Sequence, residues 1–146
     1  MKKILFAVLF TTGLMVGTQA QNSAKQKLKA EEVPAALKSS FNSEFPNAKD
    51  VEWSLKEGKY KVKFELNDLD HFAKYDANGT RMAKGMEIKQ NELPPAVMAA
   101  VKKDHANKEI DDVFKVEKDG ATQYLVIFDE DIKVMYTADG QVVTNK

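Results

Sequence analysis

The sequence predicts an α+β fold of two tandem repeats, each a helix followed by antiparallel strands, with the helices packed on one face of the sheet. Each half of the chain opens with apolar residues at every fourth position, which is typical of a helix with one buried side. Alternating apolar and polar residues follow, which is typical of strands with one buried face. The links between these strands are too short for parallel crossovers, so we expect antiparallel pairing.

Three short segments recur in the same order in both halves, and they define the repeats. The helix start EVPAAL resembles ELPPAV, the strand YKVKF resembles YLVIF, and the strand with its turn YDANG resembles YTADG. The first of each pair begins at residue 32, 60 or 75, and the second at residue 92, 124 or 136. We therefore expect a first repeat over residues 32–83, a linker or edge strand over 84–91, and a second repeat over 92–146.

Each predicted helix carries one apolar stripe. Its members are Val33, Leu37, Phe41 and Phe45 in the first repeat, and Leu93, Val97, Val101 and His105 in the second. Pro34 and Pro94 suit the first helical turn, where a missing N–H has no partner. Pro46 is expected to end the first helix and Asn107 the second.

The strands are separated by Asn, Asp and Gly residues, which favour tight turns. We expect strands at residues 51–55, 60–66 and 71–75, with fourth-strand edge elements at 80–83 and 86–88, and in the second repeat at 113–117, 123–128, 132–137 and 141–144. Trp53 alternates with Val51 and Leu55 and is expected in the core.

The first twenty residues have the three parts of a secretory signal peptide. Lys2 and Lys3 are followed by an apolar run and then by small residues around Gln19, so we expect cleavage before Gln21. A membrane anchor is the alternative, but the apolar run is shorter than the roughly 20 residues that span a bilayer. We expect a periplasmic or secreted protein with a flexible lead-in at residues 21–31 and no membrane contact after cleavage.

The composition narrows the function further. Basic and acidic residues each number 22, which removes the general electrostatic reason to expect a nucleic-acid partner. The chain has no cysteine, which excludes disulfides, thiolate metal sites and a cysteine nucleophile. We expect a monomer with no cofactor.

The repeated helix start, the Tyr-x-Val-x-Phe strand and the Tyr-x-x-x-Gly turn resemble the PepSY-like, beta-lactamase-inhibitor-like proteins exported by Bacteroidetes-type bacteria. The resemblance covers Val33 to Val143. The tandem arrangement is similar to that of beta-lactamase inhibitory protein, from which this chain differs by having no cysteines and no matching inhibitory contact residues. The resemblance implies helices over an antiparallel sheet whose other face binds a partner, and relatives that include peptidase propeptides and enzyme inhibitors.

No catalytic or metal-binding signature stands out. His71 and His105 are the only histidines, and no serine elbow, glycine-rich phosphate loop or paired metal-ligand motif is present. We therefore expect no catalytic residues, no metal site and no enzymatic activity. Acidic clusters such as Asp68 with Asp70 could bind calcium, but they lie where hairpins turn, so turn chemistry is the preferred interpretation. A calcium or small-ligand carrier is the alternative function.

The strand side chains that point away from the helices differ between the repeats. In the first repeat Lys59, Lys61 and Lys63 form a basic ladder, whereas the second repeat places Leu125, Ile127 and Met135 there. These apolar residues are either buried under another segment or form an exposed patch beside the lysines. On the second reading, the six residues bind a protein or peptide, as an inhibitor or chaperone-like partner of an exported enzyme.

Overall fold

The computed structural model describes residues 24–129 and 132–144. The predicted signal peptide, residues 1–20, lies outside these residues. Within them the chain forms an eight-stranded antiparallel sheet and two α-helices, so the predicted α+β class is confirmed. Among the described residues, no helix is long and apolar enough to cross a membrane.

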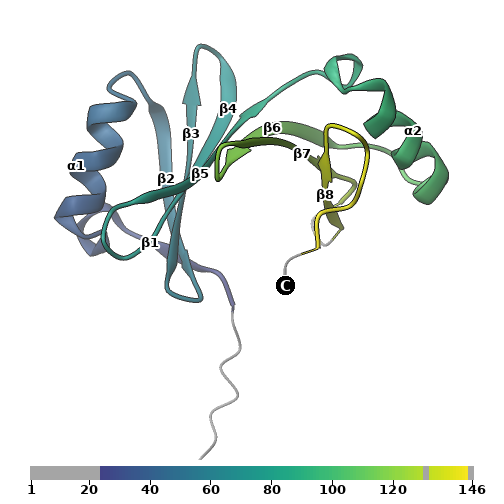
Figure 1. The fold of residues 1–146 in the computed structure, drawn as a ribbon. Coiled ribbons are helices and arrows are strands. Elements are labelled where there is room, and N and C mark those ends of the chain that lie inside the picture. Colours follow the sequence, from purple (N-terminus) through teal and green to yellow (C-terminus); the bar gives the residue numbers. More distant parts are fainter. Residues whose placement is uncertain (1–23, 130–131, 145–146) are drawn as a thin grey trace, which may run out of the picture.

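The strands lie in the sheet in their order along the chain, each antiparallel to the next. Their bounds are β1 Gln26–Leu28, β2 Lys49–Lys56, β3 Lys59–Leu66, β4 Leu69–Tyr75, β5 Arg81–Glu87, β6 Asp112–Lys118, β7 Ala121–Ile127 and β8 Lys133–Thr137. Helix α1 spans Ala35–Glu44 and helix α2 spans Pro95–Asp104. Figure 1 shows the two helices at opposite ends of the molecule, with the sheet between them.

Three hairpins close with two-residue turns in which both residues have positive φ angles. The turns are Glu57-Gly58, Asn67-Asp68 and Asp119-Gly120. Such turns have a twist that matches the right-handed twist of the strands. The glycines and asparagine that identified these turns in the sequence therefore also fix the register of the strands.

Both helices begin and end in similar ways. Each follows a short 3-10 turn in which a glutamate carboxylate accepts a hydrogen bond from the backbone N–H of a lysine three residues earlier, Glu32 from Lys29 and Glu92 from Lys89, both at 2.7 Å. Helix α1 ends before Pro46, because proline disfavours a helical conformation in the preceding residue. Helix α2 ends at Asp104 and not at the expected Asn107, because the chain turns at once and the N–H of Lys108 donates to the His105 carbonyl.

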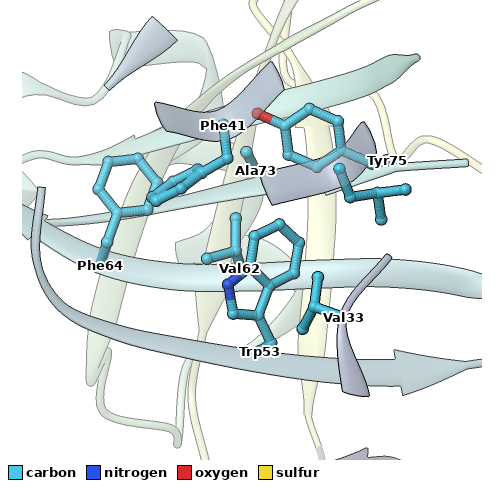
Figure 2. Packing of buried hydrophobic residues seen from close by; sticks show 8 residues of the cluster. Val33, Phe41, Trp53, Val62, Phe64, Ala73 and Tyr75 are labelled. Carbon is cyan, nitrogen blue, oxygen red and sulfur yellow. The ribbon is translucent and has the colours of Figure 1, made fainter. Parts of the chain in front are cut away.

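Each helix contributes its buried stripe to a separate core cluster. Leu37 and Phe41 of α1 pack with Trp53, Val62, Phe64, Ala73 and Tyr75 of β2, β3 and β4 (Figure 2). The Phe41 ring centroid lies 5.1 Å from that of Phe64 and 5.5 Å from that of Trp53, both edge-on. In the second half, Val97 and Val101 pack with Val113, Val126, Phe128 and Tyr136. Trp53 is therefore a core residue, as predicted.

The middle of the sheet differs from the sequence expectation. The prediction of an edge strand within residues 84–91 was wrong. Strand β5 pairs with both β4 and β6 and therefore lies inside the sheet, between the two halves. The flexible lead-in was wrong for residues 26–28, which pair with β2 as β1. The expected last strand at 141–144 is reduced to a single bridge between Val142 and Tyr136.

Candidate binding groove on the sheet

The strand register divides the side chains of the sheet between two faces. The helix-side face bears the strand residues of the two core clusters, such as Val62, Ala73 and Val126. The opposite side, which we call the open face, bears Lys61 and Phe72 of the first half. No residue of α1 or α2 belongs to the cluster of buried residues on this face.

The open face has an apolar floor that extends across both repeats. Phe72, Ala83 and Val116 are buried in it, and Phe114, Leu125 and Met135 are half-buried against them. The Phe72 and Phe114 ring centroids lie 5.5 Å apart in an edge-on arrangement. Phe72 lies opposite Gly85, which lies opposite Val116, so β5 joins the apolar side chains of the two halves. The floor is therefore complete only when both repeats are present.

Gly85 is needed for this packing. A Cβ added at Gly85 would lie 2.6 Å from Cζ and 2.9 Å from Cδ1 of Phe72, closer than non-bonded carbons approach. The Phe72 ring therefore occupies the space that the side chain of any other residue at position 85 would need. The Nζ of Lys61 lies over the Phe72 ring, 4.7 Å from its centroid and within cation–π distance.

Lysines surround one side of the apolar floor. Burial, together with the like charges of Lys74, Lys63, Lys133 and Lys25, lowers the pKa of Lys61 to about 7. Among the described residues, no acidic side chain lies within ion-pair distance of Lys61, Lys63, Lys74 or Lys133. Lys63 is opposite Glu52, but the Glu52 carboxylate is 3.1 Å from the Nζ of Lys27. We call Lys61, Lys63, Lys74 and Lys133 the lysine cluster. Lys61 and Lys74 lie opposite each other in register, and no ion pair joins the four lysines to acidic side chains of the described residues.

The floor and the lysines enclose a groove of about 300 Å³. Its lining includes Lys61, Lys63 and Phe72 from the first repeat and Phe114, Leu125 and Ile127 from the second. Lys133 of β8 also lines it, although β3 and β8 lie far apart in strand order, so the sheet curves to bring them to one cavity. Acidic residues outnumber the three lysines in the lining, and they are Asp50, Glu52, Glu65, Asp70 and Asp112. Glu65 and Asp70 lie opposite each other toward one end of β3 and β4, whereas Lys61 and Lys74 lie opposite each other toward the other end.

A second hollow of about 210 Å³ lies beside Phe45, His71 and Met86. Of its charged lining residues, Lys84 and Glu117 form an ion pair of 3.3 Å, and Lys115 is exposed. This hollow therefore has one lysine beside an ion pair, whereas three lysines line the groove on the open face.

Four of the six residues chosen from the sequence line the groove: Lys61, Lys63, Leu125 and Ile127. Met135 lies in the floor beside Leu125, and Lys59 lies on the same face at the end of β3, opposite Lys56 and outside the groove. The apolar members are half-buried, which is intermediate between the two alternatives considered from the sequence.

Sequence reasoning missed Phe72 and Phe114. Both sit in strands where the neighbouring residues, Ala73 and Val113, face the helix-side core. The alternation of each strand would have placed the two rings on the open face.

The acidic turns and the histidines have structural roles. The Asp76 carboxylate accepts hydrogen bonds from the backbone N–H groups of Asn78 and Thr80, and that of Asp129 accepts one from Ile132. His71 stacks on Phe64, and the His105 ring lies 4.5 Å from that of Phe128. Within residues 24–129 and 132–144, no three His, Cys, Asp or Glu side chains converge as a metal site would require.

Three crystal structures have a similar fold. A DUF2874 family protein from Bacteroides uniformis ATCC 8492 aligns with a TM-score of 0.64 and 20% identity, over 77% of this chain and 87% of the other. A protein described as putative periplasmic, from Bacteroides eggerthii DSM 20697, aligns with a TM-score of 0.65 and 17% identity, over 77% of this chain and 86% of the other. A BLIP-like protein from Bacteroides fragilis NCTC 9343 aligns with a TM-score of 0.56 and 24% identity, over 77% of this chain and 84% of the other. At these identities the likeness concerns the fold.

The family comparison agrees with the repeats. No curated protein matches the chain. The family profile described as "Putative beta-lactamase-inhibitor-like, PepSY-like" matches twice in tandem, over residues 17–81 and 76–144. Together these matches cover most of the sequence, and the chain therefore belongs to this PepSY-like, beta-lactamase-inhibitor-like family, as its repeated motifs predicted.

Proposed function

We propose that this protein is an exported, non-enzymatic binding module that recognises a protein or peptide partner through the open face of its sheet. The observation that carries the proposal is the groove, in which a half-buried apolar floor lies beside lysines that form no ion pair with acidic side chains in the described part of the chain. Large apolar patches rimmed by polar groups commonly mark interaction sites. The beta-lactamase-inhibitor-like description of the family supports a partner that is itself a protein.

Export is part of the proposal. It is supported by the charged, apolar and small-residue parts of residues 1–20, and by the periplasmic description of a structurally similar protein. Mass spectrometry of the protein from the envelope fraction should find Gln21 as the first residue. A cytoplasmic protein that retains Met1 would contradict export.

Substitutions in the groove test the binding proposal. We expect Leu125→Gln combined with Ile127→Asn to abolish capture of envelope proteins by the immobilised chain, because both side chains line the groove. Leu69→Gln is the matched control, since Leu69 is 40% exposed and lies outside the groove. Amide NMR spectra would show whether the fold is retained. Unfolding of the groove variant would mean that these residues belong to the core, and unchanged capture by a folded variant would exclude the groove.

If a partner is captured, an activity assay can tell whether this protein acts on it as an inhibitor or as a chaperone-like partner. If the partner is an exported enzyme, an inhibitor would lower its steady-state rate at stoichiometric concentration. A chaperone-like partner would leave that rate unchanged but raise the yield of active enzyme on refolding. The groove variant should lose either effect.

A further inference from the structure

The lysine cluster bears on the chemistry of the partner, and this step rests on the proposed function of the groove. We propose that the segment bound in the groove is a peptide that carries a carboxylate next to an apolar side chain. The carboxylate would lie beside Lys61, Lys63 and Lys133, which line the groove, and near Lys74, which lies opposite Lys61 on β4. The apolar side chain would lie on the floor formed by Phe72, Phe114 and Leu125.

The first argument is charge complementarity. The ammonium of Lys61 is close enough to those of Lys63, Lys74 and Lys133 for their repulsion to affect its titration, and none of the four has an acidic partner among the described residues. Like charges held close together are unfavourable, and an anion placed among them removes the repulsion. A carboxylate of the partner would therefore be favoured beside Lys61 and Lys74, whereas Glu65 and Asp70 would repel it further along these strands.

The second argument is the position of these charges. The Nζ of Lys61 lies over the Phe72 ring, so the cationic site adjoins the apolar floor directly. A ligand with only a charge would leave the floor exposed, and a ligand with only apolar groups would bury the lysines without a counter-ion, which is unfavourable. One residue pair, an Asp or Glu beside an aromatic or aliphatic residue, satisfies both parts.

The third argument concerns the groups that face Lys61 from each neighbouring element. Lys63 is on its own strand, Lys74 is on β4, Lys133 is on β8 and Lys25 precedes β1. On β2 the opposite residue is Ser54, whose hydroxyl donates to the Lys61 carbonyl at 3.4 Å, and the nearby Glu52 pairs with Lys27. Asp50, Glu65, Asp70 and Asp112 also line the groove. Glu65 and Asp70 lie opposite each other, four residues along β3 and β4 from Lys61 and Lys74, and would disfavour a second carboxylate there. Because the pKa of Lys61 is about 7, Lys61 is mostly neutral above pH 7, and binding of a carboxylate there should be coupled to uptake of a proton by Lys61.

The test uses heptapeptides selected from a random display library on the whole mature protein, so it does not depend on the natural partner. We expect the selected peptides to contain Asp or Glu beside an apolar residue, and replacement of that acid by its amide should weaken binding at least tenfold. Lys61→Met should weaken binding by a similar factor, because methionine keeps an apolar chain of similar length and removes the charge. Lys115→Met is the matched control, since Lys115 is exposed and lies in register with Met86, away from the floor.

The pH dependence gives a second readout. Affinity of the wild type for an acidic peptide should fall about tenfold from pH 6 to pH 8, as Lys61 loses its proton. Lys61→Arg should keep the affinity but lose the pH dependence, because arginine stays protonated throughout this range.

The outcomes separate this inference from the proposed function. One outcome would overturn the inference that the peptide carries a carboxylate but would leave the groove as the binding site. In it, the selected peptides lack acidic residues, bind Lys61→Met normally and fail to bind the Leu125→Gln, Ile127→Asn variant. Peptides that bind both variants normally would exclude the groove itself. A chain that elutes as a dimer and displaces the peptides with rising concentration would mean that a second copy occupies the groove, which also overturns the inference.

Discussion

Gly85 and Phe72 form the contact on which the apolar floor depends. We predict that Gly85→Ala destabilises the protein by about 1–3 kcal/mol, because the added Cβ overlaps the Phe72 ring and forces it to move. Urea denaturation would measure the loss. In a Phe72→Leu background the same Gly85→Ala change should have a much smaller effect, since the overlap is with the ring. Equal effects in both backgrounds would show that the strand and not the ring demands glycine.

Lys61 should make the stability of the protein depend on pH. In the folded state its pKa is lowered to about 7, mainly by burial, whereas in the unfolded state it keeps the ordinary value of 10.5. Between these two values the unfolded chain binds the extra proton, so the free energy of unfolding should rise as the pH increases from 7. We predict a shallower rise from pH 7 to pH 9 in Lys61→Met, measured by urea denaturation at each pH.

A smaller rise of the free energy of unfolding with pH should remain in Lys61→Met. The pKa of Lys74 is lowered in the same direction, by burial first and then by Lys118, Lys59, Lys133 and Lys56. Identical pH profiles of the wild type and Lys61→Met would show that Lys61 keeps its ordinary pKa in the folded protein.

At the scale of the element, the ends of the two helices can be compared directly. Phe45 follows α1 and lies 4.6 Å from Phe64, while His105 follows α2 and lies 4.5 Å from Phe128, and both donate their N–H to a carbonyl four residues earlier at 2.8 Å. His105 therefore fills the place of a phenylalanine with a smaller, more polar ring.

An exchange of these side chains tests the equivalence. We predict that His105→Phe stabilises the protein by about 0.5–1 kcal/mol through added apolar burial, and that Phe45→His destabilises it by about 1–2 kcal/mol. Thermal unfolding at one pH would measure both. A loss of stability in His105→Phe would mean that the imidazole makes a polar interaction that phenylalanine cannot replace.

Most strands could be predicted because their alternation and turn residues act locally. Glu57-Gly58 and Asp119-Gly120 turn with positive φ in both residues, a requirement that the glycines make visible in the sequence. Strand β1 could not be predicted, because its three residues are polar or half-exposed and are ordered only by pairing with β2. Likewise, nothing local distinguishes β5 as a central strand, since its position depends on pairing with β6 of the other repeat.

The candidate site was predictable to the extent that alternation assigns a face. Lys61, Lys63, Leu125 and Ile127 were placed on the open face correctly, and all four line one groove. Their closeness was not predictable, because it arises from the curvature of a sheet in which β3 and β8 are distant in order. For the same reason, the proximity of Lys133 to Lys61 could be seen only in the structure.

At the scale of the whole molecule, the two repeats share one sheet. Strand β5, from the end of the first repeat, pairs with β6 of the second through five residue pairs, Ala83 to Glu87 with Lys118 to Phe114. The buried Phe72, Ala83 and Val116 then pack across this junction. Modules of about 60 residues bury little surface and are only marginally stable alone, so we infer that each repeat depends on the other.

This dependence predicts one unfolding transition. Leu37 and Val97 are fully buried in different core clusters, one in each repeat. We predict that Leu37→Ala lowers the free energy of unfolding by about 2–5 kcal/mol and Val97→Ala by about 2 kcal/mol, because each leaves a cavity. Both substitutions should shift the same single transition in differential scanning calorimetry, with calorimetric and van't Hoff enthalpies in agreement. Ser39→Ala on the exposed side of α1 is the control and should leave the transition in place. If Leu37→Ala instead separated an early transition that Val97→Ala does not affect, the repeats would be independent domains, and the groove between them would open when the first repeat unfolds.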